Sequence, residues 1–166
     1  MMLAAIGAVV LFILILIIGA LVSKGGGNST GLVDVSARAQ EIIRVTNAEK
    51  SDLKDPSALS VAATVNAVVS SEQSQINNYL TSKHIKTDKK KLAIYQSSAT
   101  DTQMAAALQA NSLDTTYTNY LRSALTSYAQ AIQTAYASTS NATTKSILQN
   151  AYASTETLLT TPPLKS

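Results

Sequence analysis

Residues 55–83, DPSALSVAATVNAVVSSEQSQINNYLTSK, contain the clearest helical pattern of the chain and indicate its fold class. Asp55 is typical of an N-cap because its side chain accepts from exposed backbone N–H groups, and Pro56 suits the first helical position. The residues that follow recur with the spacing of three and four that places side chains on one helix face. These stripe positions are Leu59, Ala62, Val65, Val69, Glu72, Ile76, Tyr79 and Leu80. The stretch therefore predicts an amphipathic helix over residues 57–83.

Glu72 is the acidic member of this stripe. A carboxylate on the apolar side of a helix is costly to bury unless it is paired. Buried polar groups in proteins are almost always hydrogen-bonded. If Glu72 is buried, we therefore expect Tyr, Ser or Gln side chains to be its partners.

Glycine and proline are distributed in a way that favours helices over strands. All six glycines lie at or before Gly31, and the prolines are Pro56, Pro162 and Pro163. Hairpins and barrels normally need many glycine turns. The domain after Gly31 is therefore predicted to be all-α.

Further helices are predicted from apolar spacing and capping residues. One covers about residues 34–53 and ends before the Asp-Pro stop. Another covers residues 100–138 and opens with Thr100 and Gln103, which form a capping box of the type Thr-x-x-Gln. Weak helix formers at residues 111–116 could bend this long helix.

The last helix is predicted over residues 141–159, where a pair of prolines soon follows. The tail, residues 161–166, is predicted to be disordered. Four helices with two short connections and one long connection are typical of an antiparallel four-helix bundle. We therefore expect one such bundle over residues 34–160.

The N-terminal part of the chain contains an uninterrupted apolar run, LAAIGAVVLFILILIIGALV, from Leu3 to Val22. As a helix it would be about 30 Å long, which matches the hydrocarbon core of a bilayer. A secretory signal peptide usually has a shorter apolar region, preceded by Lys or Arg. Residues 1–23 are therefore predicted to be a transmembrane anchor, and a signal peptide cleaved near Gly19 and Ala20 is the alternative.

A glycine-rich segment, KGGGNSTG at residues 24–31, follows the anchor and predicts a flexible linker over residues 24–33. Lys24 alone would favour a cytoplasmic domain by the positive-inside rule. The cysteine-free composition rich in Ser, Thr, Asn and Gln, and Asn-x-Thr sequons at Asn28 and Asn141, favour the exterior. We therefore expect a single-pass protein of the cell membrane with an extracytoplasmic C-terminal domain.

The composition excludes several kinds of chemistry. The chain has no cysteine and one histidine, so a disulfide, a thiolate metal site and a cysteine nucleophile are impossible. Its net charge of +3 is small and dispersed, which argues against a nucleic-acid partner. With no credible Ser-His-Asp arrangement and no phosphate-binding glycine loop, we expect that the protein is not an enzyme.

A four-helix bundle raises the question of a di-iron site, which needs Glu-x-x-His motifs on two of the helices. That motif is absent. Each predicted helix does contain an acid, and the four are Glu41, Glu72, Asp114 and Glu156. We therefore expect no metal or cofactor, and a degenerate carrier would require all four carboxylates to face one cavity.

The long connection after residue 82 carries most of the local positive charge, in the sequence SKHIKTDKKKLAIY. Such a cluster could meet lipid head groups, an anionic polymer or an acidic protein. The alternative is a solvated loop. The candidate residues for an anionic partner are Lys83, His84, Lys86, Lys89, Lys90 and Lys91.

With an N-terminal span, a glycine-rich tether and a helix that ends in SKHIKTDKKKLAIY before a TD-type helix start, the chain resembles membrane-anchored ferritin-like domains of unknown function. Such domains occur on reduced-genome bacteria of the candidate phyla radiation. The resemblance covers residues 34–160 and implies a ferritin-like bundle at the cell surface, often without iron ligands. It implies no catalytic residue.

Together these observations predict a membrane-tethered helical module with a structural or protein-interaction role at the cell envelope. Its expected partners are the membrane, through Leu3 to Val22, and an unidentified envelope protein or anionic polymer. One alternative is a degenerate ferritin-like carrier of a metal or small ligand. Another is a filament subunit assembled through the N-terminal helix.

Overall fold

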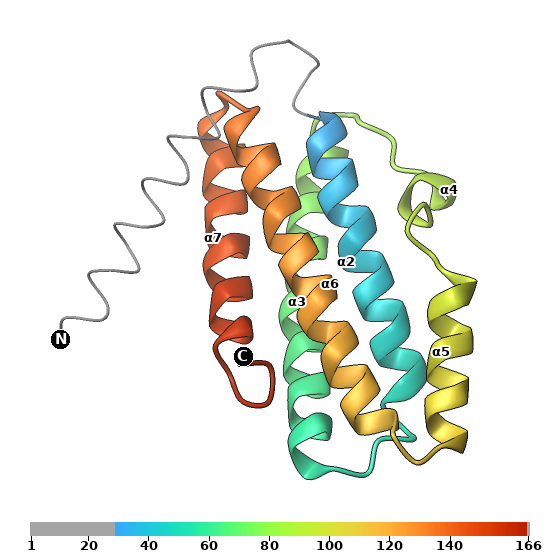
Figure 1. Cartoon of the computed structure of the whole chain (residues 1–166). Coiled ribbons are helices and arrows are strands. Elements are labelled where there is room, and N and C mark those ends of the chain that lie inside the picture. Colours follow the sequence, from blue (N-terminus) through green and yellow to red (C-terminus); the bar gives the residue numbers. More distant parts are fainter. Residues whose placement is uncertain (1–28, 166) are drawn as a thin grey trace, which may run out of the picture.

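The computed structural model describes residues 29–165, and these residues form an all-helical domain (Figure 1). Six helices pack against one another, and no strand occurs in this range, so the all-α prediction is confirmed. They are α2 (Ser29–Glu49), α3 (Pro56–Ser82), α4 (Lys89–Leu92), α5 (Ser98–Gln109), α6 (Leu113–Ala137) and α7 (Ala142–Leu159). The anchor predicted over residues 1–23 lies outside the described residues, as does the first part of the predicted linker.

The four long helices enclose a common core. Helix α2 lies against α3 and α6, and α7 lies against the same two helices. The chain runs in one direction along α2 and α7 and in the opposite direction along α3 and α6 (Figure 1). The shorter helices α4 and α5 connect α3 to α6 and pack on the outside of the domain, beside α2 and α6.

The start of α3 confirms the predicted cap. Asp55 is the N-cap, its side chain accepts from the backbone N–H of Ser57 at 3.2 Å, and Pro56 occupies the first turn. The predicted apolar stripe matches the core-facing side of α3 from Ala62 onward, but the stripe begins at Ala58 rather than at Leu59. In the first turn of α3, Ala58 faces the core and is fully buried, whereas its neighbour Leu59 is 39% exposed.

Helix α2 begins five positions earlier than predicted, so residues 29–33, expected as linker, are helical. Gly31 lies in the first turn of α2 and touches α6. A Cβ atom at Gly31 would lie 3.1 Å from the Cβ of Ala135, tighter than most such contacts in proteins. This glycine therefore allows α2 and α6 to approach each other. In the sequence it is also the last residue of the glycine-rich segment 24–31.

The long helix predicted over residues 100–138 is two helices, α5 and α6. Ser97, and not Thr100, caps α5, and its side chain accepts from the backbone N–H of Thr100. The chain turns at Asn111, which has a φ of 52°, a left-handed conformation that Asn tolerates better than most residues. The N–H of Ser112 then bonds to the carbonyl of Ala107 at 2.9 Å and ends the helix.

The C-terminal tail packs against the domain, so the prediction of disorder over residues 161–166 is wrong for its described part. The side chain of Leu164 is 1% exposed. Arg122 on α6 donates to the carbonyl of Leu164 at 2.9 Å and to that of Pro163 at 3.2 Å. The buried side chain of Leu164 and two charge-assisted hydrogen bonds from Arg122 therefore fix the segment that follows α7.

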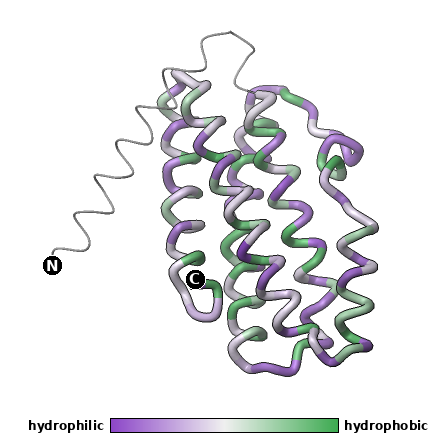
Figure 2. The backbone as a smooth tube through the Cα atoms, viewed as in Figure 1, coloured by the Kyte–Doolittle hydropathy of each residue, from purple (hydrophilic) through white to green (hydrophobic). Residues whose placement is uncertain are grey.

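Apolar and polar segments alternate along each helix (Figure 2), as expected of helices with one buried face. Two tyrosines lie in the middle of the core, and both are fully buried. The hydroxyl of Tyr117 donates to the hydroxyl of Thr46 at 3.0 Å, and that of Tyr128 donates to Glu72. The other large, fully buried side chains are Leu32, Ile42, Ile76, Leu80, Met104, Leu121, Leu125, Ile132, Leu148 and Leu164.

Candidate functional site

The predicted basic residues lie on one continuous segment near one end of the domain, from the end of α3 to the single turn of α4 (Figure 1). We call this set, Lys83, His84, Lys86, Lys89, Lys90 and Lys91, the basic end. All six residues are exposed. In Figure 1 the end of α3 lies at the same end of the domain as the start of α2, and α4 lies beside α2, close to that end.

Two helix-terminus motifs shape the backbone of the basic end. Lys83 is the C-cap of α3, and His84 adopts a left-handed φ of 58°, at the position where glycine is most common. The N–H of Ile85 then bonds to the carbonyl of Leu80 at 2.9 Å. Asp88 is the N-cap of α4 and accepts from the N–H of Lys91 at 2.8 Å. The carboxylate within this segment is therefore bonded to the backbone of α4.

A cluster of three side chains attaches this segment to α2. The guanidinium of Arg38 lies 4.2 Å from the centre of the Tyr95 ring and donates to the Tyr95 hydroxyl at 2.9 Å. Arg38 also forms an ion pair with Asp34 at 3.1 Å, and the Tyr95 hydroxyl donates to Asp34. Burial and the Asp34 carboxylate raise the pKa of Tyr95. The lysines are therefore carried on a segment that is fixed to the bundle.

Exposed lysines on a fixed segment can bind an anionic surface through several weak, salt-sensitive contacts. Ile94, three positions after Lys91 in the chain, adds an apolar element, because it is 60% exposed. The cationic group of Lys83 lies 5.6 Å from the centre of the Tyr79 ring. The arrangement offers positive charge with an apolar side chain near it in the chain.

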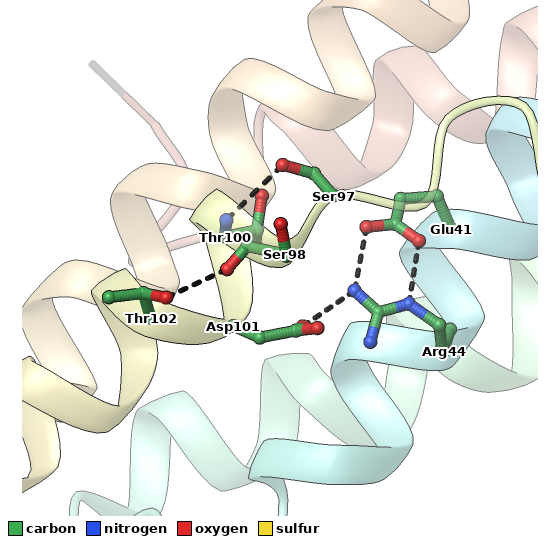
Figure 3. A network of polar contacts seen from close by, with 7 residues as sticks. All are labelled: Glu41, Arg44, Ser97, Ser98, Thr100, Asp101 and Thr102. Atoms are coloured by element: carbon green, nitrogen blue, oxygen red, sulfur yellow. Dashed lines mark hydrogen bonds and ion pairs between the residues drawn. The ribbon is translucent and has the colours of Figure 1, made fainter.

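The four acids considered for a metal site have separate surroundings. Glu41 forms a double hydrogen bond with Arg44, at 2.7 and 2.8 Å, and Arg44 continues to Asp101 on α5 at 2.7 Å (Figure 3). These two carboxylates raise the pKa of Arg44. Asp114 accepts from the backbone N–H groups of Lys54 and Asp55, at 2.9 and 3.1 Å.

The remaining two acids differ from each other in burial. Glu156 is exposed on α7. Glu72 is 6% exposed, and its Oε2 accepts from the Tyr128 hydroxyl at 3.0 Å, which confirms the expected kind of partner. Within residues 29–165, no three His, Asp or Glu residues lie close enough together to hold a metal ion.

Glu72 is the titratable group with the most unusual surroundings. Burial raises the pKa of Glu72 to about 7, while the hydrogen bond from Tyr128 and the nearby Ser154 hydroxyl oppose that rise. Its second oxygen, Oε1, is buried without a hydrogen-bond partner among the described residues. The carboxyl also lines a cavity between α3 and α7, which the sequence did not predict. The sequence feature that could have pointed to this cavity is the position of Glu72 on an apolar stripe.

None of the helices in residues 29–165 combines the length and the apolar character needed to cross a bilayer. Comparisons of the chain with models of protein families, with curated proteins and with solved structures gave no match. The geometry of the domain and the sequence that precedes it are therefore the basis of the functional proposal.

Proposed function

We propose that this chain is a single-pass, membrane-tethered helical module with a structural or protein-interaction role at the cell envelope. Its domain is extracytoplasmic, and its basic end faces the anionic lipid surface. The proposal rests on the apolar run from Leu3 to Val22 together with the place of the basic end in the fold.

The observation that carries this proposal is the short distance along the chain between the apolar run and α2. Only residues 23–28 separate Val22 from Ser29, the first residue of α2. Six residues span at most about 20 Å when fully extended. If the apolar run crosses the bilayer, the end of the domain that contains Ser29 is held close to the lipid surface. The end of α3 lies at that same end, and α4 lies close to it.

The charge of the basic end fits this orientation. Lysines near an anionic membrane surface contribute about 1 kcal/mol each, within roughly a Debye length of the lipid. Lys89, Lys90 and Lys91 are all exposed, and Asp88 is engaged in the cap of α4. The basic end would therefore orient the domain on the membrane and leave its opposite end free for a protein partner.

A ferritin-like arrangement of the four long helices forms part of this proposal. Helices α3 and α6 run in the same direction and are joined by the long connection through α4 and α5, which supports this layout. A metal carrier would need Glu41, Glu72, Asp114 and Glu156 in one cavity, and their different hydrogen-bond partners give that alternative no support. A filament subunit assembled through the N-terminal helix would not appear as detergent-soluble monomers extracted from native membranes.

Protease treatment of intact cells tests the tether and the orientation. We expect digestion of the domain while a fragment containing residues 1–24 stays in the membrane, where mass spectrometry can identify it. Recovery of the intact chain from the soluble fraction would contradict the tether. Protection on intact cells, followed by digestion when only the cytoplasmic membrane is opened, would contradict the extracytoplasmic location.

Binding to vesicles tests the role of the basic end. The full chain is reconstituted in neutral phosphatidylcholine nanodiscs, and its association with added phosphatidylglycerol vesicles is measured at low salt. We expect the double variant Lys89→Glu and Lys90→Glu to weaken this association at least about tenfold, at roughly 1 kcal/mol for each lysine lost. The control carries Lys50→Glu and Lys165→Glu, an equal charge change away from the basic end. Equal loss in both variants would contradict the proposal.

A further inference from the structure

Helices α3 and α7 leave a cavity of about 330 Å³ between them. Sites for small molecules range from about 300 to 1,000 Å³, so the cavity has room for a small ligand. Most of its walls are made of short or uncharged side chains, and helices that face each other with short side chains cannot fill the space between them. The polar members of its lining are Ser71, Glu72, Gln75, Asn150 and Ser154.

Glu72 gives this cavity an acceptor without a donor. Its side chain is more than nine-tenths buried, and Oε2 already accepts from Tyr128 on α6. Oε1 has no partner among the described residues. The hydroxyl of Ser154, across the cavity on α7, lowers the pKa of this carboxyl. That hydroxyl donates its hydrogen bond to the carbonyl of Asn150 at 3.0 Å. A buried carboxylate oxygen of a residue that lines the cavity therefore lacks a donor.

The lining of the cavity indicates the charge of such a ligand. It contains one carboxyl group and no cationic side chain, so an ionised Glu72 lacks a counter-charge there. A buried carboxylate is stabilised when a cation donates to it. A divalent metal ion takes about six oxygen ligands, which a single carboxylate with neutral neighbours does not supply. A cation that brings its own N–H donors fits this site better.

The remaining walls indicate the shape of the ligand. Ala67, Val68, Ile147 and Ala151 are apolar and line the cavity beside the carboxyl group. They can contact a short hydrocarbon stem, while Gln75 and Asn150 offer neutral polar groups. A primary ammonium on an alkyl chain of about four carbons combines these features. Such a group occurs in free alkylamines and at the end of a lysine side chain.

We propose that the cavity between α3 and α7 binds a small primary alkylammonium ion, whose N–H donates to Oε1 of Glu72. The apolar stem lies along Val68 and Ile147, and the ammonium group replaces the missing hydrogen-bond partner of the carboxylate. This site is independent of the membrane tether, because all of its residues belong to α3, α6 and α7.

A titration with n-butylammonium chloride tests the site. The full chain, labelled with ¹⁵N in neutral detergent micelles, is followed by NMR at pH 8. We expect saturable shifts of the backbone amides of residues 68–75 and 147–154. n-Butanol has a similar shape and no charge, and we expect it to bind about tenfold more weakly, since charge-assisted hydrogen bonds are roughly twice as strong as neutral ones.

Variants separate this site from nonspecific effects. Glu72→Gln keeps the shape of the side chain and removes its charge, so we expect butylammonium to bind about tenfold more weakly. Ser71→Leu puts a larger side chain into the lining of the cavity without changing Glu72 and should also reduce binding. Glu156→Gln removes an exposed carboxylate of α7 and serves as the matched control, with binding unchanged. Butylammonium binding that is equal in the Glu72→Gln variant and the unmodified chain would overturn the proposal.

A second ligand distinguishes the two sources of the ammonium group. Nα-acetyl-lysine-N-methylamide presents the same group on a peptide backbone. If the cavity takes free amines, butylammonium binds more tightly, and if it takes a lysine of a partner protein, the lysine derivative binds more tightly. Both results support an ammonium site. Shifts caused equally by n-butanol and by butylammonium would overturn it and indicate an apolar cavity without charge recognition.

Discussion

Tyr128 on α6 donates a 3.0 Å hydrogen bond to Glu72 on α3, and this pair connects two diagonal helices through the centre of the domain. Both side chains are almost completely buried, and burial raises the pKa of each. Among the described residues, the hydroxyls of Tyr128 and Ser154 lower the pKa of the Glu72 carboxyl. The protonation of one carboxyl is therefore coupled to the stability of the bundle.

The stability of the domain should fall as pH rises through the pKa of Glu72. The folded pKa is about 7 and the ordinary value is 4.5, so the folded state holds this proton more tightly than the unfolded state does. The stabilising effect is complete below about pH 4.5 and is lost as pH rises through 7. Its size is on the order of 3 kcal/mol. Urea unfolding of the full chain between pH 4.5 and 8.5 measures it.

The variant Glu72→Gln removes this titration and keeps an acceptor for Tyr128. We expect the free energy of unfolding to be higher than that of the unmodified chain at pH 8, and to lose this component of its pH dependence. Glu156→Gln, at an exposed position, is the control and should keep the original slope. A Glu72→Gln variant with an unchanged pH profile would contradict the coupling.

Removing the donor has the opposite effect on the same carboxylate. Tyr128→Phe leaves Glu72 without its tyrosine partner, so we expect a loss of about 2 kcal/mol above pH 7. The loss should be smaller at pH 5, where the carboxyl is protonated in the folded state. Tyr117→Phe removes the 3.0 Å bond to Thr46, which has no charge, and should cost about 1 kcal/mol at both pH values. Equal losses at both pH values for Tyr128→Phe would show that the carboxylate is not involved.

Features that depend on neighbouring residues in the chain could be predicted from the sequence. Asp55 was expected to cap a helix, and its side chain does accept from the N–H of Ser57. The last helix was expected to begin at residue 141, and Asn141 is the N-cap of α7. The place of Glu72 on an apolar stripe was predicted, its side chain is buried there, and its partner is of the type expected for a buried Glu72. In each case the deciding interaction is local or follows from helical periodicity.

Features that depend on partners distant in the sequence could not be predicted in this way. Gly31 looks like part of a flexible linker until Ala135 is placed beside it. The break at Asn111 depends on one left-handed residue, which helical spacing does not reveal. The cavity beside Glu72 exists because short side chains of α3 and α7 face each other, and neither helix alone shows that pairing.

The contact between Arg44 and Asp101 should control the local stability of α5. Asp101 is half exposed, and such ion pairs contribute up to about 1 kcal/mol. We expect Asp101→Asn to lower hydrogen-exchange protection in residues 98–109 while the global free energy of unfolding changes by less than about 1 kcal/mol, because Arg44 keeps its bonds to Glu41. Asp88→Asn, in the cap of α4, is the comparison variant and should leave α5 unaffected. Unchanged protection of α5 in the Asp101→Asn variant would contradict this role.

The packing of the C-terminal tail can be tested at Leu164. Its side chain is buried next to α6, and Arg122 holds the carbonyls of Leu164 and Pro163. Core Leu→Ala substitutions cost about 2 to 5 kcal/mol, and a terminal segment can move to fill space, so we expect a loss near 2 kcal/mol. Urea unfolding of Leu164→Ala measures this loss, and the control is Lys165→Ala at an exposed position, which should have no effect. If Leu164→Ala also leaves stability unchanged, the tail contributes nothing to the fold, and the bonds from Arg122 only hold it in place.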